Sequence, residues 1–283
     1  MNISNLTKGL AMGAVLACMA PMTASADESA ELVIDGVTLV TRTAAPDHMN
    51  IDEIISGWVF RSDETQAMQM DDFDNPGMLQ VDAAAADWAT VEGEAGESCQ
   101  SCHGDPSSMA GVRTVMPRYN EAAGDLWSLE EYINNCRTER MQAEAWGWNS
   151  EDMISMTGLI SLQSRGMVVN VAIDGPATPY WEQGREMYYT RYGQLELACA
   201  NCHEDNYGNL IRADHLSQGQ TNGFPAYRLK TTGLNSIHNR FRGCIRDTRA
   251  ETFAIGSPEL KALELYVASR GNGLSVEGPS VRN

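Results

Sequence analysis

Two pentapeptides decide how this chain folds: Cys99-Gln100-Ser101-Cys102-His103 and Cys199-Ala200-Asn201-Cys202-His203. In such a Cys-x-x-Cys-His motif the two sulfurs lie about one helical turn apart, so they can form thioethers with the vinyl groups of one haem. The adjacent histidine then reaches the iron. We therefore predict two covalently bound haem c groups. Their attachment points and first iron ligands would be Cys99, Cys102 and His103, and Cys199, Cys202 and His203.

Two other uses of paired cysteines fit the pattern less well. A structural zinc site needs four converging ligands, usually with a shorter gap between the two cysteine pairs. A thioredoxin-like redox pair has no use for an adjacent histidine in both copies. The repeated histidine therefore favours haem.

An internal repeat surrounds the two motifs. Each motif is followed by one further cysteine, Cys136 or Cys244, and then by a Ser-Arg-Gly tripeptide that begins at Ser164 or Ser269. Apolar residues before each tripeptide recur with helical period, which predicts an amphipathic closing helix. These residues are Met153, Met156, Leu159 and Ile160, and Leu260, Leu263, Tyr266 and Val267. We therefore expect a mainly α fold, with two tandem cytochrome c-like domains and an N-terminal extension.

The first 26 residues have the pattern of an export signal. One charge, Lys8, precedes an apolar run over residues 10–20, and Ala24-Ser25-Ala26 supplies a cleavage site. The run is too short to span a bilayer, and no later stretch reaches about 18 apolar residues. We expect a soluble protein of the periplasm without membrane insertion. Removal of the signal leaves six of the seven cysteines.

The remaining chain divides near residue 172, where the β-like run 168–173 is followed by glycine and prolines. Residues 27–172 would form an N-terminal extension and the first haem domain, against which the extension packs. Residues 173–283 would form the second, catalytic haem domain.

Helices are expected before each haem motif. Residues 83–88 would begin the first haem-bearing helix, and residues 181–197 would form its counterpart in the second half. Tyr188 and Tyr189 would then lie against the haem or a partner helix.

Charge distinguishes the two halves. The chain has a formal net charge of −18, which argues against nucleic acid or an anionic membrane as a partner. Residues 228–249 nevertheless carry six basic residues and one acidic residue, whereas the matching residues 120–141 carry two basic and five acidic ones. The positive window surrounds Cys244 and would attract an anion. Arg240 is the predicted substrate contact, because a guanidinium binds oxyanions with paired donors.

Several residues could supply the second ligand of each iron. Methionine is usual in electron-transfer cytochromes c, but none follows Met187 in this chain. Equivalence within the repeat favours Cys136 and Cys244 as thiolate ligands, which would lower the potential of the haem. A disulfide between these two cysteines and an inert buried thiol remain alternatives. Other candidates are Met109, Met116 and Met141 in the first half, and His215, His238, Lys230 or an empty position in the second.

Three histidines lie outside the two motifs. His215 is interpreted as a surface residue and His48 as a structural one. His238 lies six residues before Cys244, so it could hydrogen-bond a haem propionate or lie beside the substrate.

These motifs resemble those of the SoxA family, the A subunits of SoxAX cytochrome complexes, in their dihaem form. The resemblance rests on the paired motifs, the lone cysteine after each, the export signal and the run Arg240-Phe241-Arg242-Gly243-Cys244. It covers essentially the whole chain after the signal. It implies an L-cysteine S-thiosulfotransferase that oxidatively couples thiosulfate to a cysteine of a carrier protein, SoxYZ. It also implies a heterodimer with a small cytochrome c subunit, SoxX, which receives the electrons.

The resemblance also assigns roles to individual residues. His103 and Cys136 would ligate the iron of the first haem, and His203 and Cys244 that of the catalytic haem. Cys244 would carry a persulfide, and Arg240 would lie near the substrate.

Two other functions remain open from the residues. A plain dihaem electron carrier would have a haem of high potential and would not need Cys244. A dihaem peroxidase would have a five-coordinate iron after reduction. The missing methionine in the second half weighs against the carrier, and the cysteine pairing weighs against the peroxidase.

Overall fold

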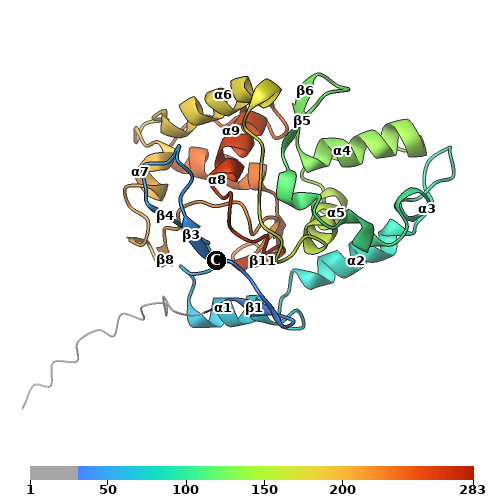
Figure 1. Ribbon diagram of the computed structural model, residues 1–283, viewed down its shortest axis with the longest axis horizontal. Helices are drawn as coiled ribbons and strands as arrows, with labels where there is room; N and C mark the ends of the chain where they lie inside the picture. The colour runs from blue at the N-terminus through green and yellow to red at the C-terminus, as the bar shows by residue number, and fades with distance from the viewer. Residues whose placement is uncertain (1–30) are drawn as a thin grey trace, which may run out of the picture.

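The computed structural model describes residues 31–283, and the predicted signal lies outside these residues. Two similar helical units form its bulk, as Figure 1 shows with the first unit in cyan to green and the second in yellow to red. Each unit contains a long helix, a short helix bearing the haem motif, a β-hairpin, the helix of the lone cysteine and a closing helix. The predicted fold class is therefore confirmed.

The two units have matching elements in the same order. The first consists of α2 (Met78–Trp88), α3 (Cys99–His103), β5 (Arg118–Asn120), β6 (Asp125–Trp127), α4 (Leu129–Asn135), the π-helical turn η3 (Cys136–Met141) and α5 (Glu151–Leu162). The second consists of α6 (Thr178–Tyr189), α7 (Cys199–His203), β9 (Ala226–Arg228), β10 (Gly233–Asn235), α8 (Ile237–Asp247) and α9 (Pro258–Ser269). A short hairpin of β7 (Leu210–Ile211) and β8 (Asp214–His215) follows α7 in the second unit.

The closing helices form where the apolar periodicity predicts them, but they are not amphipathic. Every residue of α9 from Leu260 to Ser269 is buried, including Lys261 and Glu264. Lys261 donates hydrogen bonds to Asp125 and Glu131 of the first unit, both at 2.9 Å. The polar face of α9 therefore packs against the first unit instead of facing water, because its charged groups find partners there.

Both predictions for the helix before the haem motif were wrong in their bounds. Residues 83–88 form the C-terminal part of α2 and not the start of a haem-bearing helix, because the motif occupies the separate α3. In the second unit α6 ends at Tyr189, well before residue 197. The loop that follows turns at Gly193, at φ +63°, where an added Cβ would lie 2.3 Å from the Thr248 carbonyl oxygen. This close approach ties the loop to the end of α8.

The two units share their cores through exchanged hairpins. Leu234 of the second hairpin packs in the core of the first unit, where its side chain lies 3.3 Å from a Cβ added at Gly158. Leu126 of the first hairpin packs in a cluster with Leu265 and Ala268 of α9. The β-like run at 168–173 forms only an isolated bridge, Val168 to Ser275. The boundary near residue 172 stays a prediction, and the units on either side of it are interlocked.

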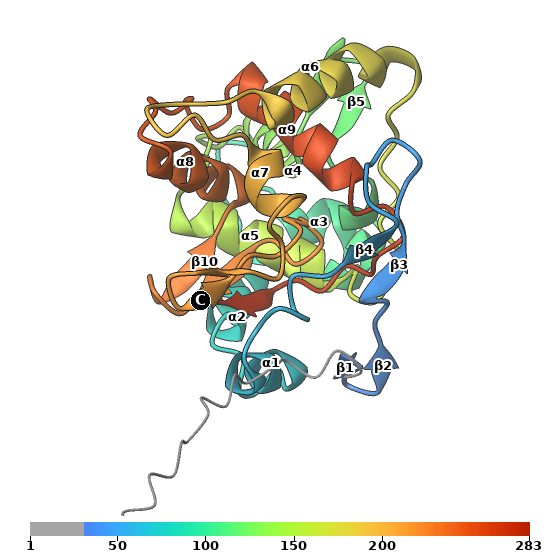
Figure 2. The same ribbon diagram turned by 90° about the vertical axis from the view of Figure 1, so that its left-hand side faces the viewer.

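The N-terminal extension packs mainly on the second unit, so its predicted position on the first domain was wrong. It contains β1 (Val33–Ile34), β2 (Val37–Thr38), β3 (Arg42–Ala44), β4 (Glu53–Ile55) and α1 (Asp63–Met70). The extension runs beside the α7 side of the second unit and the C-terminal segment (Figure 2). The Ile55 N–H donates to Gln218 Oε1 at 2.7 Å, and Met49 and Ile54 form an apolar cluster with Leu274.

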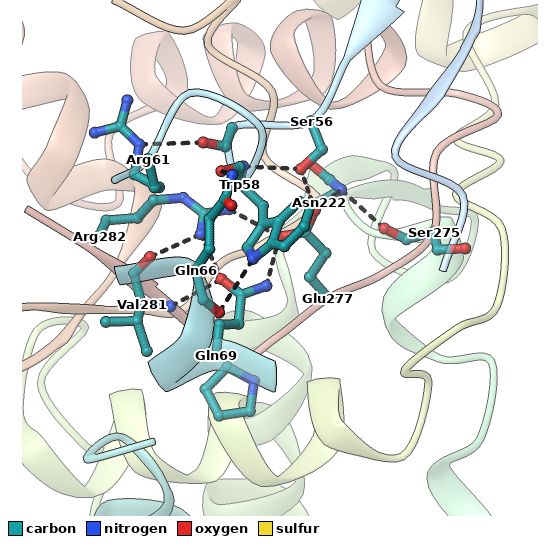
Figure 3. A network of polar contacts seen from close by, with 12 residues as sticks. Ser56, Trp58, Arg61, Gln66, Gln69, Asn222, Ser275, Glu277, Val281 and Arg282 are labelled. Carbon is teal, nitrogen blue, oxygen red and sulfur yellow. Dashed lines mark hydrogen bonds and ion pairs between the residues drawn. The ribbon is translucent and has the colours of Figure 1, made fainter. Parts of the chain in front are cut away.

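A buried polar network fixes the extension to the last residues of the chain. Glu277 is fully buried and accepts hydrogen bonds from Ser56, from Gln69 at 3.0 Å, from Asn222 at 3.2 Å and from Arg282 at 2.8 Å (Figure 3). A buried carboxylate needs such partners, because an unpaired charge there costs several kcal/mol. The network joins α1 to β11 (Ser280–Arg282), which pairs in parallel with β9.

We predict that Gly184→Ala destabilises the protein. Gly184 lies where α6 crosses α9, and an added Cβ would be 2.0 Å from the Ala262 carbonyl oxygen, so the two helices must separate. The free energy of unfolding should fall by about 2 kcal/mol or more in a urea titration of the holoprotein. Gln183→Ala, on the exposed side of the same helix, should change it by less than about 0.5 kcal/mol. Equal effects of the two substitutions would contradict the close crossing.

Candidate functional site

Local contacts orient the histidine of the second haem motif. The Nδ1 of His203 lies 2.7 Å from the Ser217 carbonyl oxygen, so this nitrogen carries the proton and donates it. Gly219, at φ +78°, packs on the ring, and a Cβ there would be 3.0 Å from Cγ and Nδ1. These contacts leave Nε2 as the nitrogen that can bind a metal.

The lone cysteine of the second unit meets this histidine. Cys244 projects from α8 close enough to His203 for the imidazole to affect the ionisation of its thiol. Burial raises the pKa of the Cys244 thiol, but the positive charge of Arg240 and the nearby His203 lower it more, to about 7. The second unit therefore places an easily ionised thiol opposite the imidazole of its haem motif.

The first unit repeats the arrangement with different surroundings. Cys136 lies near Cys102 of its own motif, and burial raises the pKa of the Cys136 thiol. The neighbouring Arg137 is held elsewhere: it pairs with Glu92 at 2.6 Å and lies 3.8 Å over the Trp146 ring. At Cys136 burial thus outweighs the positive charge of Arg140, whereas at Cys244 the positive charge of Arg240 and the nearby His203 outweigh burial.

The alternative of a disulfide between Cys136 and Cys244 is wrong. All six cysteines within residues 31–283 are free. Each lone cysteine instead faces the haem motif of its own unit. Tandem units that are interlocked by their hairpins do not bring these two positions together.

The other ligand candidates are mostly committed to different contacts. His238 is buried, stacks on Trp148 and lies 3.1 Å from Glu264 Oε2, so it lies at the interface between the units. His215 Nδ1 contacts the Gly208 carbonyl oxygen at 2.9 Å, in a half-buried position. Met116 lies in the core of the first unit.

Two predictions for structural aromatic contacts are confirmed. His48 packs against Trp181 and Tyr266, with ring centroids 5.3 and 6.1 Å apart. Tyr188 packs against the partner helix α9, where its ring centroid lies 5.2 Å from that of Tyr266.

Arg240 lies near Cys244, and two further arginines lie near Arg240, of which sequence reasoning had found only one. Arg240 lowers the pKa of Cys244, and its side chain makes no hydrogen bond or ion pair within the described part of the chain. Arg228 on β9 and Arg61 after β4 both lie close enough to Arg240 for its charge to lower their pKa values further, after burial has lowered them. Arg61 could not be found from the sequence, because it belongs to the extension and carries no motif.

The donor set fits a covalently bound haem in each unit. Two cysteines and a histidine lie on one short helix, α3 or α7, and a third cysteine faces them from another helix. Thioether formation needs free thiols, and all of these cysteines are free within residues 31–283.

Comparisons with known proteins agree with this geometry. The family model "SoxA/TsdA, cytochrome c domain" matches residues 83–169 and 183–276, one match for each unit. The L-cysteine S-thiosulfotransferase subunit SoxA of Paracoccus pantotrophus is 63% identical over 87% of this chain and 86% of its own length. This chain belongs to the SoxA family. Its cytochrome c domains imply bound haem c, as the motifs predict.

Further SoxA relatives extend the match. The SoxA subunit of Rhodovulum sulfidophilum is 59% identical over 92% of both chains. The crystal structure of SoxXA from P. pantotrophus matches with a TM-score of 0.88 and 61% identity, and covers 90% of this chain and 99% of that one. The predicted family is therefore confirmed. Among residues 31–283 of this SoxA-family chain, no helix is long and apolar enough to cross a membrane.

We predict that Gly219→Ala alters the histidine of the second site. The added methyl group would press on the His203 ring at 3.0 Å and turn it, so the absorption spectrum of the ferric holoprotein should change. Gly208→Ala is a matched control, because it has φ +81° but no atom within 4 Å of an added Cβ. Both variants carry similar backbone strain. If their spectra are indistinguishable, the contact of Gly219 with His203 does not position the ring.

Proposed function

We propose that Cys244 is the residue at which this SoxA-family L-cysteine S-thiosulfotransferase subunit joins thiosulfate to a cysteine of a carrier protein of the SoxYZ type. The observation that carries the proposal is the position of the Cys244 thiol, which faces His203 and has its pKa lowered to about 7 beside the unpaired Arg240. A thiolate is the nucleophilic form of cysteine. Arg240 supplies the positive charge that favours both the thiolate and an anionic substrate.

We assign two haem c groups to the chain. Cys99, Cys102, His103 and Cys136 would hold the first. Cys199, Cys202, His203 and Cys244 would hold the second. When bound, a haem with a thiolate ligand supplies a redox centre of low potential that accepts electrons one at a time.

The overall reaction balances as thiosulfate plus a carrier thiol giving an S-thiosulfonated cysteine, one proton and two electrons. In the first step the Cys244 sulfur forms an S–S bond with the outer sulfur of thiosulfate, and two electrons leave. In the second, the carrier thiolate attacks that outer sulfur, the first bond breaks and Cys244 regains its thiolate. The order of the two partners can be exchanged without changing this balance.

A small cytochrome subunit of the SoxX type would receive the electrons. The similarity to a SoxXA complex supports this heterodimer. The export signal supports a periplasmic location, where carrier and partner would meet the enzyme.

We predict that Cys244→Ala lowers thiosulfate-dependent transfer more than about a thousandfold while covalent haem attachment remains, since Cys199 and Cys202 are untouched. Transfer is followed by the mass of the thiosulfonated carrier cysteine, and haem attachment by haem staining. Cys136→Ala removes the equivalent thiol of the other unit and should keep measurable transfer. Full activity of the Cys244 variant would contradict the role given to this sulfur and would favour a plain electron carrier.

A further inference from the structure

Arg228 is a second arginine whose charge interacts with Cys244. It ends β9, and its Nε and Nη2 donate hydrogen bonds of 2.8 and 2.6 Å to the Asn283 main-chain oxygen. An arginine has five N–H donors, so three remain free for another acceptor. The Arg228 guanidinium is thus held in one orientation and keeps free N–H donors for another acceptor.

The anchor of Arg228 is itself fixed by two distant parts of the chain. The Asn283 side chain donates to Asp214 at 3.1 Å and accepts from Thr65 of α1 at 3.3 Å. Asp214 in turn pairs with Arg61, whose Nη2 also donates to the His215 carbonyl oxygen at 2.7 Å. The extension, the β7–β8 hairpin and the C-terminal segment therefore converge on the guanidinium of Arg228.

Two carboxylates, Asp214 and Asp247, act on Arg228, and both are paired with other arginines. Burial lowers the pKa of Arg228 and the charge of Arg240 lowers it further, whereas Cys244 and Asp214 raise it. Asp214 is already held by Arg61 and Asn283. Arg240 has no side-chain partner among residues 31–283. Two guanidinium groups with free donors thus lie close enough to Cys244 for their charges to interact with its thiol, which is an arrangement that suits a divalent oxyanion.

The repeat provides an internal comparison. The hairpins and lone-cysteine helices of the two units match residue for residue, because β5–β6 and β9–β10 have the same pairing and Ser128 and Ser236 precede the two helices at equivalent positions. At the positions of Arg228 and Arg240 the first unit has Asn120 and Tyr132. Both arginines are therefore peculiar to the site of Cys244.

We propose that Arg228 is a second substrate-binding residue, which binds the sulfonate oxygens of thiosulfate beside Cys244 together with Arg240. This inference rests on the proposed function of Cys244. On this proposal the N-terminal extension helps to position Arg228. Its residues Arg61 and Thr65 contact Asp214 and Asn283, and Asn283 in turn accepts the hydrogen bonds of the Arg228 guanidinium.

The test is the dependence of transfer on thiosulfate concentration, measured with the holoprotein, its partner cytochrome subunit and the carrier protein. Arg228→Gln should raise KM for thiosulfate about tenfold or more, because the variant loses charge-assisted hydrogen bonds to the sulfonate oxygens. Its kcat should change less than threefold, and its haem spectrum should match that of the wild type. Arg228→Lys keeps the positive charge but lacks the paired N–H donors of a guanidinium, so it should give an intermediate KM.

Lys230→Gln is the matched control, because Lys230 is an exposed cation two residues further along the same hairpin. A KM for Arg228→Gln no higher than that for Lys230→Gln overturns the inference, as does a fall in kcat with KM unchanged. Should Arg228→Gln not yield holoprotein, Arg228→Lys decides by the same comparison. A wild-type protein without thiosulfate-dependent transfer would instead refute the proposed function of Cys244.

Discussion

The approach of α8 to α7, which places the Cys244 thiol against the His203 imidazole, is the contact on which the site depends. Neither residue is held by the motif alone. Ser217 and Gly219 fix the imidazole from one side, and the turn at Gly193 ties the loop before α7 to the end of α8. The sulfur and the ring nitrogen are thus positioned by backbone contacts that larger residues could not make.

The two units share one arrangement because they are repeats of each other. They differ in the charges around the lone cysteine, and this difference suits one unit to sulfur chemistry. Gly93 meets the Met141 carbonyl oxygen as Gly193 meets that of Thr248, so both units fix their lone cysteine in the same way. The differences lie in the balance of charge and burial: Arg240 and His203 outweigh burial at Cys244, whereas Arg140 does not outweigh burial at Cys136. An unpaired cation beside a thiol favours the thiolate and attracts anions.

Much of this arrangement could be predicted from sequence, because it depends on local spacing. The haem motifs, the lone cysteines and the closing helices recur with periods that need no tertiary information. The burial of Lys261 and Glu264 could not be predicted, since their partners lie far away in the first unit. The same holds for Arg61, which reaches Asp214 across 153 residues. The ends of the helices depend on close contacts such as that of Gly193, which periodicity does not report.

Low-temperature electron paramagnetic resonance of the oxidised holoprotein tests the central claim most directly, with Cys244→Ser compared with the wild type. If Cys244 opposes His203 at an iron, the wild type should give low-spin signals typical of histidine and thiolate ligation. The variant should lose one set of these signals and keep the other. Signals typical of two histidines, or of histidine and methionine, would contradict the account, and so would a spectrum that Cys244→Ser leaves unchanged.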